Sequence, residues 1–137
     1  MRKEIITPKL TVDAIVEYKG KIILIERKNP PYGWALPGGF VDVGESVETA
    51  VRREMMEEIN TELEGLKQFA VYSDPKRDPR FHTVSVIFTA SSKIEPVAGD
   101  DAKNTKLCSE QEIKKMSQDG LICFDHSKVL LDYFNRA

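Results

Sequence analysis

Several short stretches of this chain are rich in β-branched and aromatic residues, and some alternate apolar with polar positions, which is typical of strands in a sheet. The clearest lie at residues 10–18 (LTVDAIVEY), 21–28 (KIILIERK) and 82–91 (HTVSVIFTAS). Because Lys19-Gly20 separates the first two, we expect a hairpin there. Shorter runs predict strands at residues 34–37, 65–73 and 103–108.

A different spacing marks the middle of the chain, where apolar residues recur every four positions at Val47, Val51, Met55 and Ile59. This spacing predicts a helix from Ser46 to about residue 59, with one stripe facing a core. Ser46 suits the N-cap, and the negative charge of Glu48 in the first turn is favoured by the helix dipole.

Two more helices are expected at residues 109–117 and 125–135. Ser109 with Glu112 forms a capping-box pattern, and Asp125 suits a second N-cap. Proline and glycine interrupt the chain at residues 29–33, 74–80 and 94–102, where we expect loops. Strands on both sides of a central helix, followed by a terminal helix, predict an α/β fold with a mixed sheet covered by helices on both faces.

Composition narrows the class of protein. The 137 residues suit a single domain spanning 1–137, with 41% hydrophobic and 31% charged residues and a net charge of −2. A slight acidic excess gives no reason to expect a nucleic-acid partner. With no apolar run of membrane-spanning length and no signal peptide, we expect a cytoplasmic protein with no membrane partner. Cys108 and Cys123 are too far apart for a CxxC motif, so we expect free thiols. A homodimer is left open.

Three carboxylates gather on another face of the central helix, at Glu54, Glu57 and Glu58. Their i, i+3 and i+4 spacing places them within one turn, where like charges repel. A hard divalent cation such as Mg²⁺ would relieve the repulsion, because it prefers oxygen ligands. The alternative is a solvated acidic face neutralised by Arg52 and Arg53.

Glycines precede this helix: Gly38 and Gly39 follow Pro37, and Gly44 stands before Glu45. Glycine lets a backbone approach a ligand closely. A bent loop here could offer a main-chain carbonyl as a further metal ligand and hold a diphosphate near the ion. A plain tight turn would need glycine as well.

Taken together, Gly39, five residues, Glu45, seven residues and then the run from Arg53 to Glu58 (REMMEE) resemble the signature of the Nudix hydrolases. That signature is G-x5-E-x7-R-E-U-x-E-E-x-G-U, with U a bulky apolar residue, and all six fixed positions up to Glu58 match. Asn60 replaces the second glycine, and it also suits a left-handed helix C-cap. Thr61 replaces the last apolar residue, so we expect one buried contact to be lost.

The resemblance implies an α/β/α sandwich that hydrolyses a nucleoside diphosphate linked to another group. It implies Mg²⁺ as the cofactor, with Mn²⁺ as a substitute. The implied metal ligands are the carbonyl of Gly39 and the carboxylates of Glu54, Glu57 and Glu58. Glu45 is expected to pair with Arg53 and orient the helix. Relatives often carry an extra carboxylate that acts as a base or ligand in the loop that here contains Asp100 and Asp101, and we include Asp101 in the catalytic set.

The loop at residues 74–80 carries a resemblance to one branch of the Nudix family. A proline about fifteen residues after the signature, here Pro75, marks the ADP-ribose pyrophosphatase branch, and the words SDPKRDPR (73–80) and AGDDA (98–102) are similar to small members of it. Arg77 and Arg80 carry planar donors suited to phosphate. In the alternative interpretation they pair with Asp74 and Asp78 in a solvated loop.

We assign the expected substrate-binding set to the residues around the glycine turn and this loop: Arg27, Gly38, Gly39, Pro75, Arg77 and Arg80. Arg27 could reach a phosphate or pair with Glu26. His82 and His126 have no ligand partner at a suitable spacing, so we expect structural or surface roles.

The leading hypothesis is Mg²⁺-dependent hydrolysis of ADP-ribose to AMP and ribose 5-phosphate. A second is hydrolysis of a dinucleotide, a nucleotide sugar or an oxidised nucleoside triphosphate. A third is a non-catalytic, ligand-sensing Nudix domain that regulates transcription. Intact glutamates, the acidic charge and the absence of a DNA-binding segment after Ala137 favour an enzyme.

Overall fold

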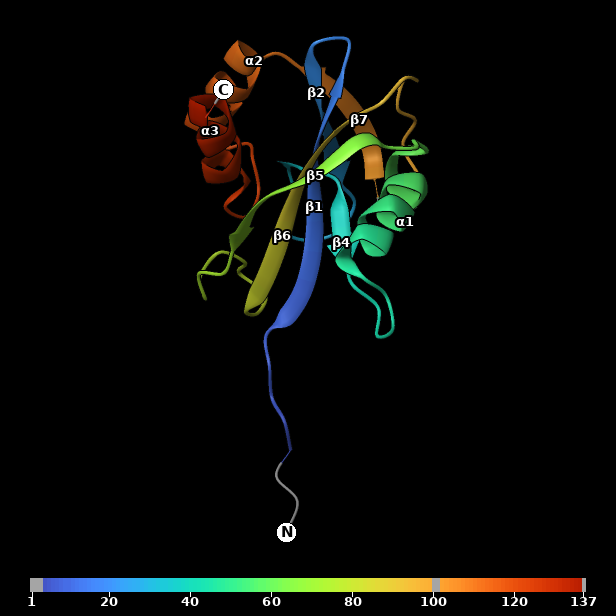
Figure 1. Ribbon diagram of the computed structural model, residues 1–137. Coiled ribbons are helices and arrows are strands. Elements are labelled where there is room, and N and C mark those ends of the chain that lie inside the picture. Colours follow the sequence, from blue (N-terminus) through green and yellow to red (C-terminus); the bar gives the residue numbers. More distant parts are fainter. Residues whose placement is uncertain (1–3, 100–101, 137) are drawn as a thin grey trace.

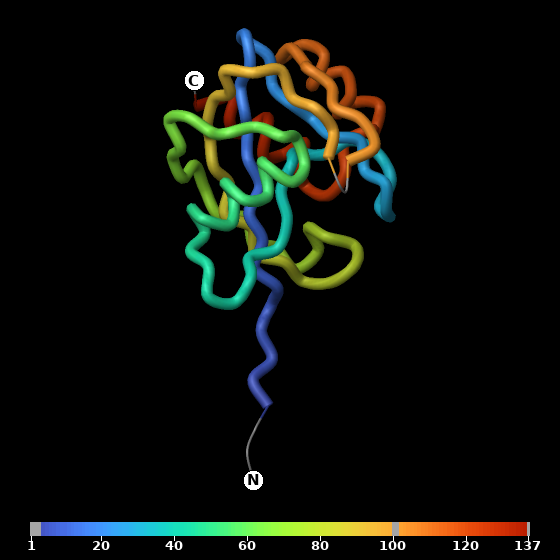
Figure 2. Tube along the Cα trace, turned by 90° about the vertical axis from the view of Figure 1, so that its right-hand side faces the viewer, coloured from blue at the N-terminus to red at the C-terminus, as the bar shows by residue number. Residues whose placement is uncertain are grey.

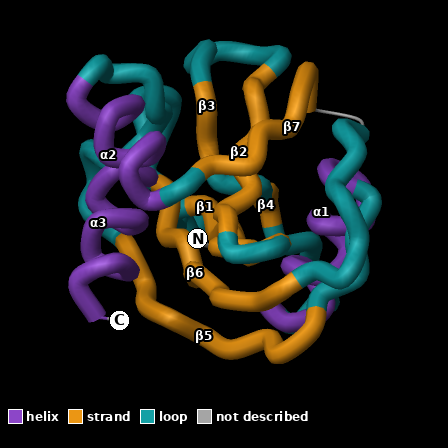
Figure 3. The backbone as a smooth tube through the Cα atoms, turned by 90° about the horizontal axis from the view of Figure 1, so that it is seen from above, coloured by secondary structure: helices purple, strands orange, loops and turns teal. Residues whose placement is uncertain are grey.

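A mixed sheet lies between α1 on one face and α2 and α3 on the other in the computed structural model, which describes residues 4–99 and 102–136 (Figures 1 and 3). Its strands are β1 (Lys9–Tyr18), β2 (Lys21–Arg27), β3 (Trp34–Ala35), β4 (Gly38–Phe40), β5 (Glu64–Tyr72), β6 (Thr83–Ser91) and β7 (Ala102–Cys108). The helices are α1 (Val47–Ile59), α2 (Glu110–Gln118) and α3 (His126–Arg136). The predicted α/β/α sandwich is confirmed.

The strand order is β3-β2-β1-β6-β5, with β4 beside β1 and β7 beside β2. The β1–β6 pair is parallel and the other pairs are antiparallel, so the sheet is mixed. Strand β1 changes partner along its length: Thr11 and Asp13 face β4, whereas Glu17 and Tyr18 face β2. The sheet therefore opens between the start of β1 and the end of β2.

Alternation along the central strands fills two cores, one on each face of the sheet. Val12, Ala14 and Val16 of β1 belong to the core beneath α1. Ile15, between them, belongs to the core beneath α2 and α3. Strand β2 divides its residues in the same way, with Ile23 and Ile25 in the first core and Ile22 and Leu24 in the second.

The ends of α1 follow the expected capping chemistry. Ser46 accepts a hydrogen bond from the backbone N–H of Thr49, and Asn60 takes the left-handed conformation at the C-cap (φ 54°, ψ 43°). The capping box of Ser109 and Glu112 is also present. Asp125 directly precedes α3 as predicted, but the hydrogen bonds of its carboxylate go to Arg77.

Two expectations need correction. The expected glycine turn at residues 38–40 is strand β4, because Gly38, Gly39 and Phe40 pair with Asp13, Val12 and Thr11. Thr61 is fully buried, and its hydroxyl lies 3.3 Å from that of Ser92, so a hydrogen bond replaces the apolar contact. Other element boundaries shift by one or two residues.

Residues 4–8 lead away from the body of the molecule as an extended segment (Figure 2). Cys108 and Cys123 are buried free thiols, as expected. Within the described ranges, no helix is long and apolar enough to cross a membrane.

Candidate active site

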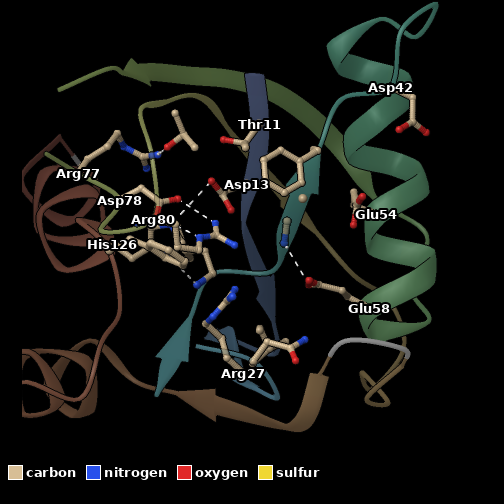
Figure 4. Close-up of a pocket in the computed structure, with 18 residues that line it drawn as sticks. Thr11, Asp13, Arg27, Asp42, Glu54, Glu58, Arg77, Asp78, Arg80 and His126 are labelled. Atoms are coloured by element: carbon tan, nitrogen blue, oxygen red, sulfur yellow. Dashed lines mark hydrogen bonds and ion pairs between the residues drawn. The ribbon is translucent and has the colours of Figure 1, made fainter. Parts of the chain in front are cut away.

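A pocket of about 390 Å³ lies where the sheet opens. Its lining comes from the start of β1, the end of β2, β4, α1, the 74–80 loop and the turn before α3. Glu54 and Glu58 reach it from α1 on one side, while Arg77, Asp78, Arg80 and His126 lie opposite (Figure 4). The pocket thus has an acidic wall and a basic wall.

Strand β4 forms the base of the acidic wall. Its Gly38 N–H donates to Oε2 of Glu58 at 3.2 Å, and Glu58 is 94% buried, with a relative exposure of 6%. A Cβ at position 39 would stand only 2.5 Å from both carboxylate oxygens of Glu54. Glycine at position 39 therefore keeps open the space in front of that carboxylate.

The guanidinium of Arg53 gathers the surrounding carboxylates. It donates to both oxygens of Glu45 at 2.7 and 2.8 Å, and to Glu54 at 2.8 Å and Glu57 at 3.2 Å. It also donates to the carbonyl of Phe40 at 3.0 Å, which ties α1 to β4. The predicted Glu45–Arg53 pair is present in the structure and holds the 41–46 loop against the helix.

Hydrogen bonds from Arg53, and then from the backbone N–H of Asp42, lower the pKa of Glu45 to about 2 from an ordinary 4.5. A lowered pKa stabilises the folded state above the unfolded value, and this contribution disappears as pH falls through the folded value. We therefore expect Glu45→Gln to destabilise the protein at neutral pH. The difference in unfolding free energy between wild type and variant should shrink as pH falls from 4.5 to about 2.

Urea unfolding of both proteins across this range measures that difference. Other carboxylates titrate in both proteins and cancel, so a gap that stayed constant with pH would contradict the assigned ion pair.

The donor set on this wall suits a hard cation. Glu54, Glu58 and Gly39 line one pocket, and carboxylate and main-chain carbonyl oxygens are ligands that Mg²⁺ accepts. Across the described residues, no three His, Cys, Asp or Glu side chains are gathered tightly enough to hold an ion. Arg53 binds Glu54 and Glu57, and Gly38 binds Glu58, so the carboxylates are held by hydrogen bonds at the edge of the space. Glu57 is half exposed and is not part of the pocket lining.

The two arginines of the 74–80 loop, Arg77 and Arg80, differ in burial and in hydrogen-bond partners. Arg77 is buried and donates twice to Asp125, at 2.7 and 3.0 Å, and once to Thr83 at 2.7 Å. Arg80 pairs with Asp78, as the alternative interpretation expected, and lines the pocket. Asp74 instead accepts from the backbone N–H of Lys76.

Arg27 also lines the pocket, and its neighbour Glu26 accepts a hydrogen bond from Asn104. The Arg27 guanidinium donates to the carbonyls of Pro31 and Pro30 at 2.9 and 3.4 Å. Pro75 is exposed and is not part of the pocket lining. Asp100 and Asp101 lie outside the described residues, although Gly99 before them donates to the carbonyl of Glu58 at 2.6 Å.

Sequence reasoning missed the floor of the basic wall. Asp13 of β1 is buried and accepts a hydrogen bond from the Ser85 hydroxyl, with His126 Nε2 3.7 Å away. Burial alone would raise the pKa of Asp13, but His126 and Ser85 together keep it below its ordinary value. The available signal was an aspartate among the apolar residues of a buried strand.

His126 has the structural role expected of it and also lines the pocket. Its Nδ1 accepts a hydrogen bond from the N–H of Leu36 at 3.0 Å, so a proton on Nε2 faces Asp13. His82, at the start of β6, contacts the carbonyl of Ser73 at 2.9 Å.

The α/β/α sandwich, with its glycine strand facing a glutamate-bearing helix, is the arrangement expected of a Nudix hydrolase. A family model described as the NUDIX domain matches residues 7–129. The chain therefore belongs to the Nudix family. It is 43% identical over 129 residues to an ADP-ribose pyrophosphatase of Methanocaldococcus jannaschii. The aligned region covers 92% of this chain and 73% of that relative.

Solved structures agree with this assignment. The NUDIX domain of Shewanella oneidensis NrtR complexed with ADP ribose superposes with a TM-score of 0.83 at 26% identity, covering 96% of this chain and 90% of that one. A bifunctional NMN adenylyltransferase/ADP ribose pyrophosphatase of Francisella tularensis, complexed with AMP and a manganese ion, gives a TM-score of 0.82 at 29% identity. That match covers 95% of this chain but 42% of the Francisella chain.

Proposed function

We propose that this chain hydrolyses ADP-ribose to AMP and ribose 5-phosphate with the help of a divalent cation. The observation that carries the proposal is a single pocket with carboxylates on one wall and guanidinium groups on the other. A diphosphate bridging two sugars needs both, because its charge must be neutralised while its two ends are held. The relatives described as ADP-ribose pyrophosphatases support this substrate.

The acidic wall would hold Mg²⁺, or Mn²⁺ in its place, through Glu54, Glu58 and the carbonyl of Gly39. Glu57 would complete the set from the exposed side, at the cost of its ion pair with Arg53. The chemistry supplied there is neutralisation of the diphosphate charge and activation of water. Glu45 and Arg53 keep the helix in place beside β4, and Asp101 is proposed as an additional carboxylate.

The basic wall would orient the substrate. Arg27 and Arg80 line the pocket and carry donors suited to phosphate oxygens. Asp13 and His126, 3.7 Å apart, form the floor between them and the glycine strand. Holding the diphosphate between the walls would bring one phosphorus to the carboxylates, which is the positional part of catalysis.

A sensing role is the second candidate, because the likeness to the NrtR NUDIX domain extends over nearly the whole chain. Binding of ADP-ribose without turnover would separate this role from catalysis. The intact set of Glu54, Glu57 and Glu58 in this chain favours turnover.

We expect purified protein to release AMP from ADP-ribose in the presence of Mg²⁺, to lose this activity in excess chelator and to regain it with Mg²⁺ or Mn²⁺. The assay measures AMP by chromatography against a panel containing a dinucleotide, a nucleotide sugar and an oxidised nucleoside triphosphate. Faster turnover of another panel member would reassign the substrate. Full activity in chelator would overturn the role of the cation, and tight binding without AMP release would favour the sensor.

A further inference from the structure

Phe124 has an unusual backbone for an aromatic residue. Its φ is +56°, in the left-handed region that non-glycine side chains seldom adopt. Two other non-glycine residues in the described ranges share this feature, Lys19 in the β1–β2 turn and Asn60 at the C-cap of α1, and both lie where such turns are common. If the turn before α3 needed only this backbone, glycine or asparagine would supply it with less strain.

The residues around Phe124 hold it in this conformation. The N–H of Cys123 donates to the carbonyl of Trp34 at 2.7 Å. The carboxylate of Asp125 is bound by Arg77, and the ring of His126 is bound by the N–H of Leu36. With both neighbours anchored, the Phe124 side chain is directed to a fixed place at the pocket lining.

Two guanidinium groups lie close to the Phe124 ring. The central carbon of Arg27 stands 4.9 Å from the centre of the Phe124 ring, and that of Arg80 stands 5.2 Å from it. Both distances lie within the range of cation–π attraction. The Phe124 ring therefore adds a restraint to two long side chains that are held elsewhere at one edge, Arg27 by the Pro30 and Pro31 carbonyls and Arg80 by Asp78 and the Phe81 ring.

Both guanidinium groups have N–H groups that are not used in the hydrogen bonds described above. Arg27 uses Nε and Nη2 for the carbonyls of Pro31 and Pro30, and Arg80 uses Nε and Nη2 for Asp78. In the part of the chain that the structure describes, Nη1 of neither arginine makes a hydrogen bond. Arg77, by contrast, uses Nε, Nη1 and Nη2 within the protein.

We infer that Phe124 is a positioning residue: its ring holds Arg27 and Arg80 at the basic wall so that their remaining N–H groups bind the diphosphate. The inference rests on the proposed function for the identity of the anion. The inference gives the three arginines different roles: Arg27 and Arg80 bind substrate, and Arg77 anchors the turn that carries Phe124.

The test measures binding of ADP-ribose by calorimetry in chelator, so that hydrolysis does not enter. Phe124→Leu removes the π face and keeps an apolar side chain, whereas Phe124→Tyr keeps the ring. The matched control is Phe69→Leu, because the Arg136 guanidinium lies 4.4 Å from the Phe69 ring and neither residue lines the pocket. We expect Phe124→Leu to weaken Kd by about tenfold, with Phe124→Tyr and Phe69→Leu within about twofold of wild type.

A double-variant cycle shows whether Phe124 acts through Arg27. Arg27→Gln should weaken binding less in the Phe124→Leu background than in wild type, a coupling that a general loss of stability would not produce. Three results with the variants would each overturn the inference: equal Kd for Phe124→Leu and Phe69→Leu, additive effects in the cycle, or failure of Phe124→Tyr to preserve binding. A wild type that does not bind ADP-ribose would overturn it as well. A wild type that binds ADP-ribose without hydrolysing it would overturn the proposed function while leaving the inference to be decided by these variants.

Discussion

Glu58→Gln should lower kcat for ADP-ribose by on the order of 10³-fold while leaving the fold intact. Glu58 is buried at the acidic wall and accepts a hydrogen bond from the N–H of Gly38. Glutamine has the same shape, and its carbonyl can accept the same hydrogen bond, so β4 should stay in place. What the substitution removes is the negative charge, which the cation and the developing charge of the reaction require. Steady-state kinetics with saturating Mg²⁺ measures the effect.

Two variants on the same helix frame this result. Glu48→Gln changes an exposed carboxylate in the first turn of α1, outside the pocket, and should leave kcat near the wild-type value. Glu57→Gln should also reduce kcat steeply if Glu57 completes the cation site. Near-normal turnover in both Glu57→Gln and Glu58→Gln would mean that the acidic wall is a solvated face that Arg53 neutralises.

Local chemistry explains what could be predicted from the sequence. The spacing of Val51, Met55 and Ile59 and the capping residues Ser46 and Asn60 act within a few residues of each other, so α1 was predicted with its ends correct to one residue. The Glu45–Arg53 pair came from the family signature. The β-rich runs at residues 10–18 and 21–28, separated by Lys19-Gly20, likewise predicted β1, β2 and the hairpin between them.

Contacts between distant segments explain what could not be predicted. Strand β4 exists because β1 offers it backbone groups at Leu10 and Ala14: the Leu10 carbonyl accepts from the N–H of Val41, and the Ala14 N–H donates to the carbonyl of Pro37. The glycine-rich sequence of β4 does not itself indicate a strand. The floor of the pocket joins Asp13 of β1 to His126, which stands at the start of α3, more than a hundred residues later. The choice of Asp125 as the partner of Arg77 depends on the turn before α3, whereas local reasoning favoured the nearby Asp74 and Asp78.

Arg77 should therefore matter first for stability. Its side chain is 97% buried, with a relative exposure of 3%, and it makes three hydrogen bonds, two of them to a carboxylate. Removing one partner of a buried pair leaves the other uncompensated, so Arg77→Met should lower the free energy of unfolding by about 3–5 kcal/mol. Arg77→Lys should recover part of this loss, because one ammonium group cannot reproduce the paired donors of a guanidinium. Urea unfolding followed by circular dichroism measures both.

Two comparisons decide whether Arg77 stabilises the turn before α3 or binds the diphosphate of the substrate. Combining Arg77→Met with Asp125→Leu removes both charges, so the double variant should be less destabilised than Arg77→Met alone. Arg80→Lys changes a partly exposed side chain with one ion pair, and it should raise KM for ADP-ribose more than it lowers stability. The reverse pattern, in which Arg77→Lys keeps wild-type stability but raises KM for ADP-ribose and not for a nucleoside triphosphate, would return Arg77 to the substrate-binding set. In that case its bonds to Asp125 would have to exchange for bonds to the diphosphate when substrate binds.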